Sequence, residues 1–191
     1  MGMINNHLTR CDWAIGNPIM TDYHDHEWGV PLHDDHKLFE NFVLDGFQAG
    51  LSWLTILKKR EAFQTAFDHF MIHTVASYDE NKINQLLDNA SIIRNRQKIL
   101  AAINNANKVK KIQAEFGSFD SYIWSFVDGN QIFNKWQSMD QIPATSPESD
   151  IMSRDMKERG FAFAGSTICY AFMQAAGLVN DHIISCFCYE R

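Results

Sequence analysis

The sequence has few of the features that would place it outside ordinary globular proteins. Its 191 residues include only four cysteines and four prolines, and no apolar run reaches the length of a transmembrane helix. The first ten residues lack the apolar stretch and cleavage pattern of a secretory signal. Cys186 and Cys188 are too close in sequence for ordinary pairing, so the cysteines do not indicate a disulfide framework. We therefore expect a cytoplasmic protein with reduced thiols.

An excess of basic residues is also missing. The formal net charge is -6, which argues mildly against a nonspecific nucleic-acid binder because phosphate attraction normally requires surplus lysine and arginine. Basic residues nevertheless gather within 58–60, 94–98, 108–111 and 154–159. Each cluster fits either a solvated helix face or a local basic surface on an acidic protein.

Strand alternation is nearly absent, with residues 131–133 as the one short candidate. Apolar residues instead recur at spacings of three and four, which is typical of amphipathic helices. This periodicity follows the caps Asp34-Asp35 and Ser118 and occupies residues 53–57, 62–70, 83–87 and 92–112. With 46% hydrophobic and 13% aromatic residues, residues 1–191 can form one all-α domain with two helical lobes.

Two further helices flank a short, glycine-bounded connection. Ser146 followed by Pro147 predicts a helix start, with the helix running to about Arg159, and a second apolar helix is predicted from Ser166 to Ala176. A hairpin of this kind can seat a DNA phosphate on outward-pointing amides, aided by the dipole of the second helix. The alternative is a tight turn without a ligand. The candidate phosphate-binding residues are Lys157, Arg159, Gly160, Phe161, Ala162, Phe163, Ala164 and Gly165.

The two ends of the chain each carry half of a candidate zinc site. Cys11 and His24 lie near the start, and His182 and Cys186 lie near the end, at a spacing that places both side chains on one face of a helix. Four protein ligands would make the Zn²⁺ structural, because no position remains for water. Each pair alone also fits a buried thiol and a hydrogen-bonded histidine. Cys188 could compete with Cys186, but the i, i+4 spacing to His182 favours Cys186.

Several long blocks, in order along nearly the whole chain, are similar to DNA-3-methyladenine glycosylase I. They lie at residues 11–13, 23–31, 48–53, 57–60, 124–126, 159–165, 167–170, 172–175 and 177–182. The resemblance implies a helix-hairpin-helix glycosylase fold in two helical lobes, with one zinc ion joining the N- and C-terminal segments. Matched residue by residue, the family's metal ligands fall on Cys11, His24, His182 and Cys186.

The resemblance also implies a base pocket. It places pocket aromatics at Tyr23, Trp28 and Trp53, and a base-recognising carboxylate at Asp45. Methylation at N3 gives adenine a delocalised positive charge, which an indole face attracts by roughly 0.5–2 kcal/mol in a desolvated site. Without the resemblance, both tryptophans would fit ordinary core positions.

Asp45 departs from the family pattern, which has glutamate there, and Phe47 stands where a glutamine is common. The loss of one methylene retracts the carboxylate by about 1.5 Å, one carbon–carbon bond. The charge is kept, but the reach is shortened. We expect activity to survive with weaker or altered discrimination among alkylated bases. The alternative is an ordinary carboxylate near a helix end.

The expected function is therefore base-excision repair. The protein would flip 3-methyladenine out of double-stranded DNA that contains alkylated purines and hydrolyse the N-glycosidic bond of that base. A broader expectation includes 3-methylguanine as a second substrate. No Schiff-base lysine matches the pocket, so strand cleavage is not expected. A monomer without membrane contact is expected. The alternative is a DNA-binding homologue whose catalysis or specificity is altered by Asp45, while a zinc hydrolase would need an open metal position.

Overall fold

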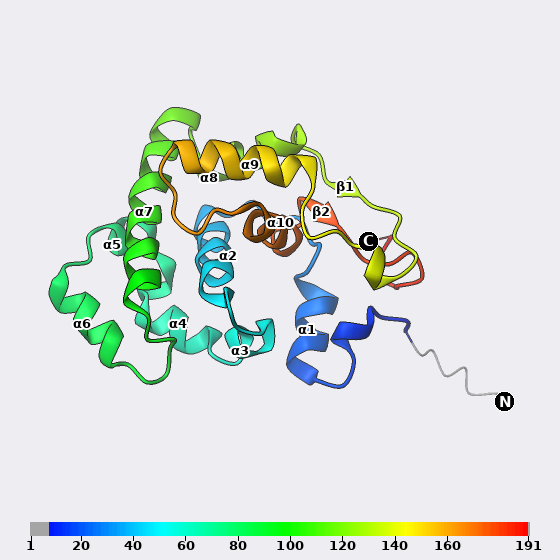
Figure 1. Cartoon of the computed structure of the whole chain (residues 1–191), viewed down its shortest axis with the longest axis horizontal. Coiled ribbons are helices and arrows are strands. Elements are labelled where there is room, and N and C mark those ends of the chain that lie inside the picture. Colours follow the sequence, from blue (N-terminus) through cyan, green and yellow to red (C-terminus); the bar gives the residue numbers. More distant parts are fainter. Residues whose placement is uncertain (1–7, 191) are drawn as a thin grey trace.

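The computed structural model describes residues 8–190 and has the all-α architecture expected from the sequence (Figure 1). The helices are α1 (Pro18–His26), α2 (Asp35–Gln48), α3 (Trp53–Leu57), α4 (Arg60–Ala66), α5 (Ile72–Ala76), α6 (Glu80–Asp88), α7 (Arg96–Phe116), α8 (Phe119–Trp124), α9 (Pro147–Glu158) and α10 (Ser166–Ala175). Short 3-10 turns are η1 (Asp12–Ala14), η2 (Asp68–Phe70), η3 (Ser125–Val127) and η4 (Met139–Gln141). The strands are β1 (Ile132–Phe133) and β2 (Val179–Asn180).

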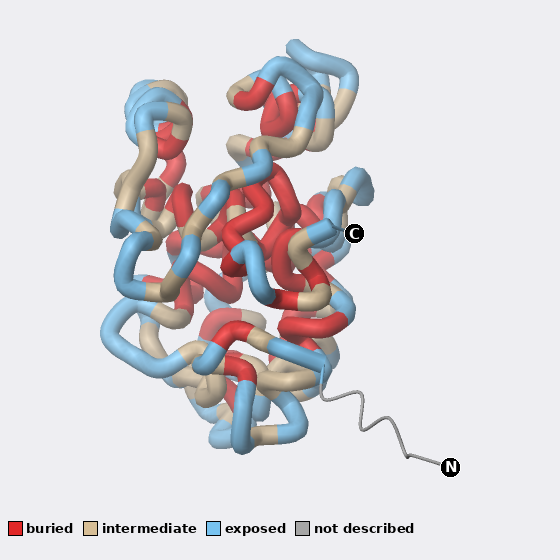
Figure 2. Tube along the Cα trace, turned by 90° about the vertical axis from the view of Figure 1, so that its right-hand side faces the viewer, coloured by how far each residue is buried: buried red, intermediate tan, exposed pale blue. Residues whose placement is uncertain are grey.

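Helix α2 runs through the centre of the molecule. It begins as predicted, because the Asp34 side chain accepts a hydrogen bond from the Lys37 amide at 2.9 Å. Every residue from 38 to 47 is buried, and α10 packs beside it, with the rings of Phe42 and Phe172 5.4 Å apart at 75°. Figure 2 shows buried backbone, in red, gathered at the middle of the fold. The side chains of α2 are therefore held in place by packing against neighbouring helices.

Two helical stretches begin or end differently from the prediction. The long helix begins at Arg96 rather than Ile92, because the Asn95 side chain caps it by accepting from the Lys98 amide. The stripe over residues 62–70 breaks after Ala66, since residues 68–70 all take positive φ values. Phe70 nevertheless reaches the core, where its ring stacks 5.5 Å from that of Phe67.

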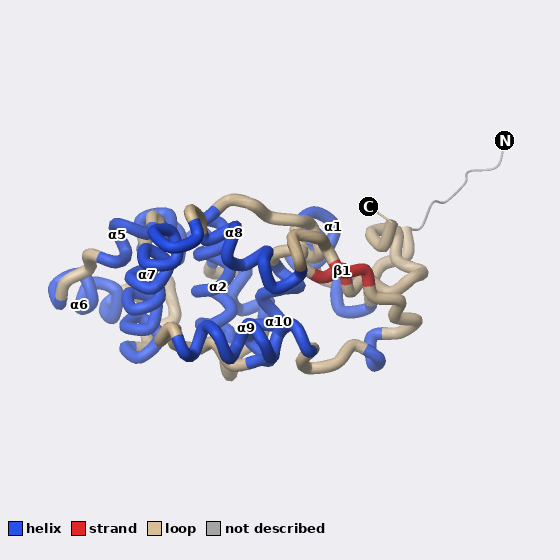
Figure 3. Tube along the Cα trace, turned by 90° about the horizontal axis from the view of Figure 1, so that it is seen from above, coloured by secondary structure: helices blue, strands red, loops and turns tan. Residues whose placement is uncertain are grey.

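The ends of the described chain meet at one end of the elongated body. Figure 3 shows α1, β1 and the C-terminal segment together, opposite the end that carries α5, α6 and α7. The short strand predicted at residues 131–133 forms at β1, and its parallel partner is β2, with Ile132 opposite Val179. No helix among residues 8–190 has both the length and the apolar character needed to cross a membrane.

The segment after α1 lies against the end of α10. The Gly29 amide donates to the Gln174 carbonyl at 2.9 Å, and the Leu32 amide donates to the Ala176 carbonyl at 3.1 Å. Gly177 makes this approach possible: it has φ +70°, and a β-carbon there would stand 2.2 Å from the Val30 carbonyl carbon. Backbone cannot yield as a flexible side chain can, so only glycine fits.

We predict that Gly177→Ala lowers the free energy of unfolding by more than about 3 kcal/mol, because a clash with backbone adds to the strain of positive φ. Gly129→Ala is the matched control: Gly129 has φ +72° and no atom within 4 Å of the added carbon. It should cost only about 1–2 kcal/mol. Urea denaturation measures both, and equal losses would contradict the role assigned to the close approach.

Candidate active site and metal site

Several aromatic side chains surround a cavity of about 420 Å³. Its walls come from segments distant in sequence: η1, α1, α2, α3, the η4 region and α10. Tyr23, Trp28, Asp45 and Trp53, the four residues that the resemblance places in a base pocket, all line it. The remaining lining residues are Trp13, Met20, Gln48, Met139, Ile142, Ala171 and Gln174.

The aromatic walls hold one another at an angle rather than in a single stack. The rings of Trp13 and Trp28 meet edge to face at 5.0 Å, and those of Tyr23 and Trp53 are tilted at 5.4 Å. Such packing fixes the orientation of each ring. The cavity is thus lined by the faces and edges of aromatic rings on several sides. Such a lining suits a flat, electron-poor ring.

Asp45 provides the only carboxylate among the residues that line this cavity. The residue is 4% exposed, and no donor within residues 8–190 hydrogen-bonds to its Oδ2. Burial raises the pKa of Asp45 well above its usual range. Burial also raises the pKa of Tyr23, with the nearby Asp45 charge as the second cause. A cation or an N–H donor entering the cavity would supply what this carboxylate lacks.

Sequence reasoning assigned no pocket role to Trp13 or Gln174. Both lie within the blocks that carry the family resemblance, so the signal was present but not specific. Met139 and Ile142 had no signal, because they come from an irregular segment that only the tertiary fold brings to the cavity. Phe47 does not line the cavity; it is 1% exposed and packs its ring 4.7 Å from that of Phe63.

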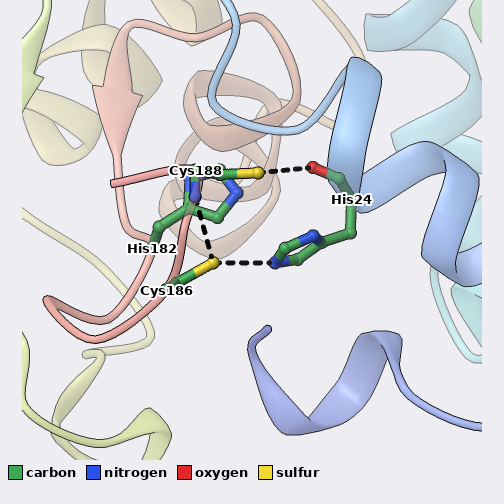
Figure 4. A group of neighbouring side chains, drawn as sticks. All are labelled: His24, His182, Cys186 and Cys188. Atoms are coloured by element: carbon green, nitrogen blue, oxygen red, sulfur yellow. Dashed lines mark hydrogen bonds between the residues drawn. The ribbon is translucent and has the colours of Figure 1, made fainter. Parts of the chain in front are cut away.

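A second cluster joins α1 to the C-terminal segment. One potential ligand atom from each of His24, His182, Cys186 and Cys188 lies within 4.8 Å of the others, and all four residues are buried. Figure 4 shows His24 approaching from α1 and the other three from the segment after β2. Two imidazoles and two thiols are a donor set that suits a metal ion such as zinc, so the group could hold one.

Acceptors behind both histidines orient their rings. His24 Nδ1 lies 2.8 Å from Asp25 Oδ1, and His182 Nδ1 lies 2.9 Å from Asn180 Oδ1. Arg10 donates to both Asp25 oxygens, and this pairing lowers the pKa of Asp25 to about 2. Supporting hydrogen bonds of this kind direct Nε2 toward a metal and are common behind metal-binding histidines.

Cys11 lies at the edge of this cluster. Its amide donates to His24 Nε2 at 3.4 Å, and its thiol hydrogen-bonds to Cys186. That thiol lowers the pKa of Cys186 to about 4, against the opposing effect of burial, while the pKa of Cys11 is raised. Cys188 Sγ lies 4.0 Å from the His24 carbonyl oxygen. The structure therefore brings three thiols to the two imidazoles.

The predicted hairpin connects α9 and α10. The predicted start of α9 is confirmed. Ser146 caps the helix, Pro147 is its first residue, and Ser146 and Ser149 form a reciprocal capping box. Asn105 on α7 clamps the hairpin, donating to the Ala162 carbonyl and accepting from the Ala162 amide at 2.8 Å. No acceptor within the described chain takes the amides of residues 163–165. Three consecutive amides at the start of α10 thus have no acceptor within the described chain, and the middle residue, Ala164, is only 2% exposed.

The two hairpin cations differ in their surroundings. Lys157 is exposed. Arg159 is engaged with residues of the same chain: it donates to Asp155 at 2.6 Å and to Glu115 at 2.8 Å, and its guanidinium lies over the ring of Phe116. Lys108 on α7 adds an ammonium group next to Gly160. The hairpin thus has one exposed cation on α9 and one from α7 beside Gly160, while Arg159 is held in intramolecular pairs and the Asp150 carboxylate accepts from the Ser166 hydroxyl at the start of α10.

The helical fold, the hairpin between α9 and α10 and the acid-bearing aromatic cavity define a helix-hairpin-helix protein with a pocket for a flat ring. The chain belongs to the methyladenine glycosylase family, whose model matches residues 13–189.

Three relatives illustrate the match. DNA-3-methyladenine glycosylase 1 of Escherichia coli (strain K12) is 44% identical over 182 residues, covering 95% of this chain and 97% of the relative. A crystal structure of 3-methyladenine DNA glycosylase I is 49% identical, with a TM-score of 0.92 and coverage of 95% and 100%. A substituted 3-methyladenine DNA glycosylase I in complex with 3-methyladenine is 34% identical, with a TM-score of 0.92 and coverage of 95% and 98%.

We predict that Asp45→Asn stabilises the protein at neutral pH. Because the folded state raises the pKa of Asp45, its charge opposes folding at any pH above the unfolded value of about 3.9. The gain should therefore be present at pH 7 and vanish below about pH 4. Chemical denaturation at both pH values measures it, with the exposed Asp140→Asn as control. A loss of stability at pH 7 would contradict the assigned environment.

Proposed function

We propose that this chain is a monofunctional DNA glycosylase that excises 3-methyladenine from alkylated double-stranded DNA in the cytoplasm. The observation that carries the proposal is the cavity in which Tyr23, Trp28 and Trp53 surround the buried carboxylate of Asp45. The solved relative in complex with 3-methyladenine supports the choice of base. Family membership supports the reaction class.

The cavity suits a cationic purine for two physical reasons. The faces of Trp53 and its neighbours attract the delocalised charge of an N3-methylated adenine more than neutral adenine. Asp45 complements the same charge and can accept a hydrogen bond from the exocyclic amine. Unmodified adenine gains neither the cation–π attraction nor the full ion pairing, so charge and shape would select the lesion.

The hairpin supplies the DNA contact in this proposal. The amides of residues 163–165, which have no acceptor in the described chain, and the N-terminal end of α10 would bind a phosphate. Lys157, exposed near the end of α9, and Lys108, next to Gly160, would add the attraction that an overall negative protein otherwise lacks. Gly46 connects this site to the cavity: it lies on the helix of Asp45, and a β-carbon there would stand 3.4 Å from Phe163 Cβ. DNA gripped at the hairpin would thus be close to the pocket.

Hydrolysis breaks the bond between base N9 and sugar C1′, and a water oxygen takes its place on C1′ while that water gives up one proton to the solvent. The bonding electrons go to the methylated purine and neutralise its charge, so the base leaves without protonation. The segment after Gly165 offers Ser166, Thr167 and Cys169 but no acid, in agreement with this route. No lysine lines the cavity, so no Schiff base or strand cleavage is proposed.

Release of methylated purines from alkylated DNA, identified by chromatography, tests the proposal. We expect the wild type to release 3-methyladenine, and Asp45→Asn to be slower by about 10- to 100-fold, the effect of losing a charge-assisted hydrogen bond. Asp45→Glu should keep activity and change the ratio of 3-methyladenine to 3-methylguanine. Duplex binding without base release by the wild type, or an inactive wild type rescued by Asp45→Glu, would overturn it.

We also propose one structural zinc ion, held by His24, His182, Cys186 and Cys11. The low pKa of Cys186 supports a thiolate ligand, and the amide contact of Cys11 with His24 and its thiol contact with Cys186 support Cys11 as the fourth ligand. Cys188 would then remain a thiol near the His24 carbonyl. The ion would hold the two terminal segments together and take no part in hydrolysis.

Metal analysis of thiol variants tests this assignment. We expect one zinc per chain in the wild type and in Cys188→Ser, and loss of zinc with a lower melting temperature in Cys11→Ser. Cobalt substitution should give a tetrahedral spectrum with two thiolates. Zinc retained in Cys11→Ser but lost in Cys188→Ser would make Cys188 the fourth ligand, and a metal-free wild type would refute the site.

A further inference from the structure

A second buried carboxylate lies behind the cavity. Asp181 follows β2, is fully buried, and accepts four hydrogen bonds, each of 2.7 Å. Asn134 Nδ2 and Trp136 Nε1 donate to its Oδ1, while Tyr170 OH and Gln174 Nε2 donate to its Oδ2. Of these four donors, only Gln174 also lines the cavity.

This carboxylate fixes the orientation of the Gln174 amide. A carboxylate only accepts hydrogen bonds, so the amide must turn Nε2 toward Asp181, since the opposite orientation would set Oε1 against Oδ2. The backbone is held as well, because the Gln174 carbonyl accepts from the Gly29 amide at 2.9 Å. No donor from residues 8–190 reaches Gln174 Oε1. The amide therefore has one acceptor left to offer.

We propose that Gln174 Oε1 is a specificity-determining acceptor for the exocyclic amine of the bound purine, and that Asp181 is the positioning residue that keeps it turned that way. This inference rests on the proposed function for the identity of the base. It adds a second acceptor to Asp45, from a different helix, in the same cavity.

The chemistry of the lesion explains why the amine is the group recognised. In a 3-methyladenine nucleotide, N9 carries the sugar, N3 carries the methyl group, and N1 and N7 are acceptors. The two hydrogens of the exocyclic amine are then the only N–H donors on the base. Asp45 can take one, and Gln174 Oε1 can take the other. A purine with a carbonyl oxygen at C6 would place a hydrogen-bond acceptor next to the acceptors of Asp45 and Gln174. Such a purine would bind less tightly.

Free-base binding, followed by tryptophan fluorescence, tests the inference without DNA. The matched probes are 3-methyladenine and 3-methylhypoxanthine, in which a carbonyl oxygen replaces the amine. Wild type should prefer 3-methyladenine, and Gln174→Met should lower this preference about tenfold, as expected for one lost hydrogen bond. Asp181→Asn should lower it at least as much, because the amide can then turn and present Nε2 to the carbonyl.

Tyr170→Phe is the matched control: it removes another donor to the same Asp181 oxygen, from a residue outside the cavity lining. It should leave the preference between the two bases unchanged. Gln174→Met keeps Asp181 and its three other donors, so it remains informative if Asp181→Asn does not fold. An unchanged preference in folded Gln174→Met would overturn the inference. A wild type with the Gln174-dependent preference that releases no base from alkylated DNA would contradict the proposed function alone.

Discussion

The cavity depends on a carboxylate held in the interior without the partners that a buried charge normally has. Asp45 belongs to α2, the helix with the longest buried run in the described chain, and its Oδ2 receives no hydrogen bond from residues 8–190. Such a group destabilises a folded protein. A site of this kind is prepared for a ligand that brings positive charge or N–H donors, and that is what an alkylated adenine offers.

Asp181 presents the opposite case. It is as deeply buried as Asp45, yet four donors satisfy it, and these donors belong to α10 and to the segment after β1. A satisfied buried carboxylate makes its neighbours rigid. In our proposal the two acids have different roles: Asp45 receives the base, whereas Asp181 fixes the orientation of Gln174 in the cavity wall. The difference lies in the surroundings, since the residue type is the same.

The elements around the cavity contact one another closely at two glycines. Gly177 allows the segment after Trp28 to lie on the end of α10, and Gly46 allows the hairpin residue Phe163 to lie on α2. The metal-binding cluster adds a third connection, between α1 and the C-terminal segment. Because these contacts join parts far apart in sequence, the cavity walls cannot move independently, and a flat ring would meet a surface already shaped for it.

The sequence by itself determined the helical class, the caps at Asp34 and Ser146, the hairpin, and the residue types for an aromatic, acidic pocket and a Cys/His cluster, because these follow from local periodicity and from recognisable motifs. The tertiary structure alone decided which of these residues share a cavity. It brought Trp13, Met139 and Gln174 to the cavity, added Cys188 to the cluster, and engaged Arg159 with Glu115 and Asp155. Spacing along a chain fixes neighbours within one helix, whereas contacts between helices depend on packing of the whole core.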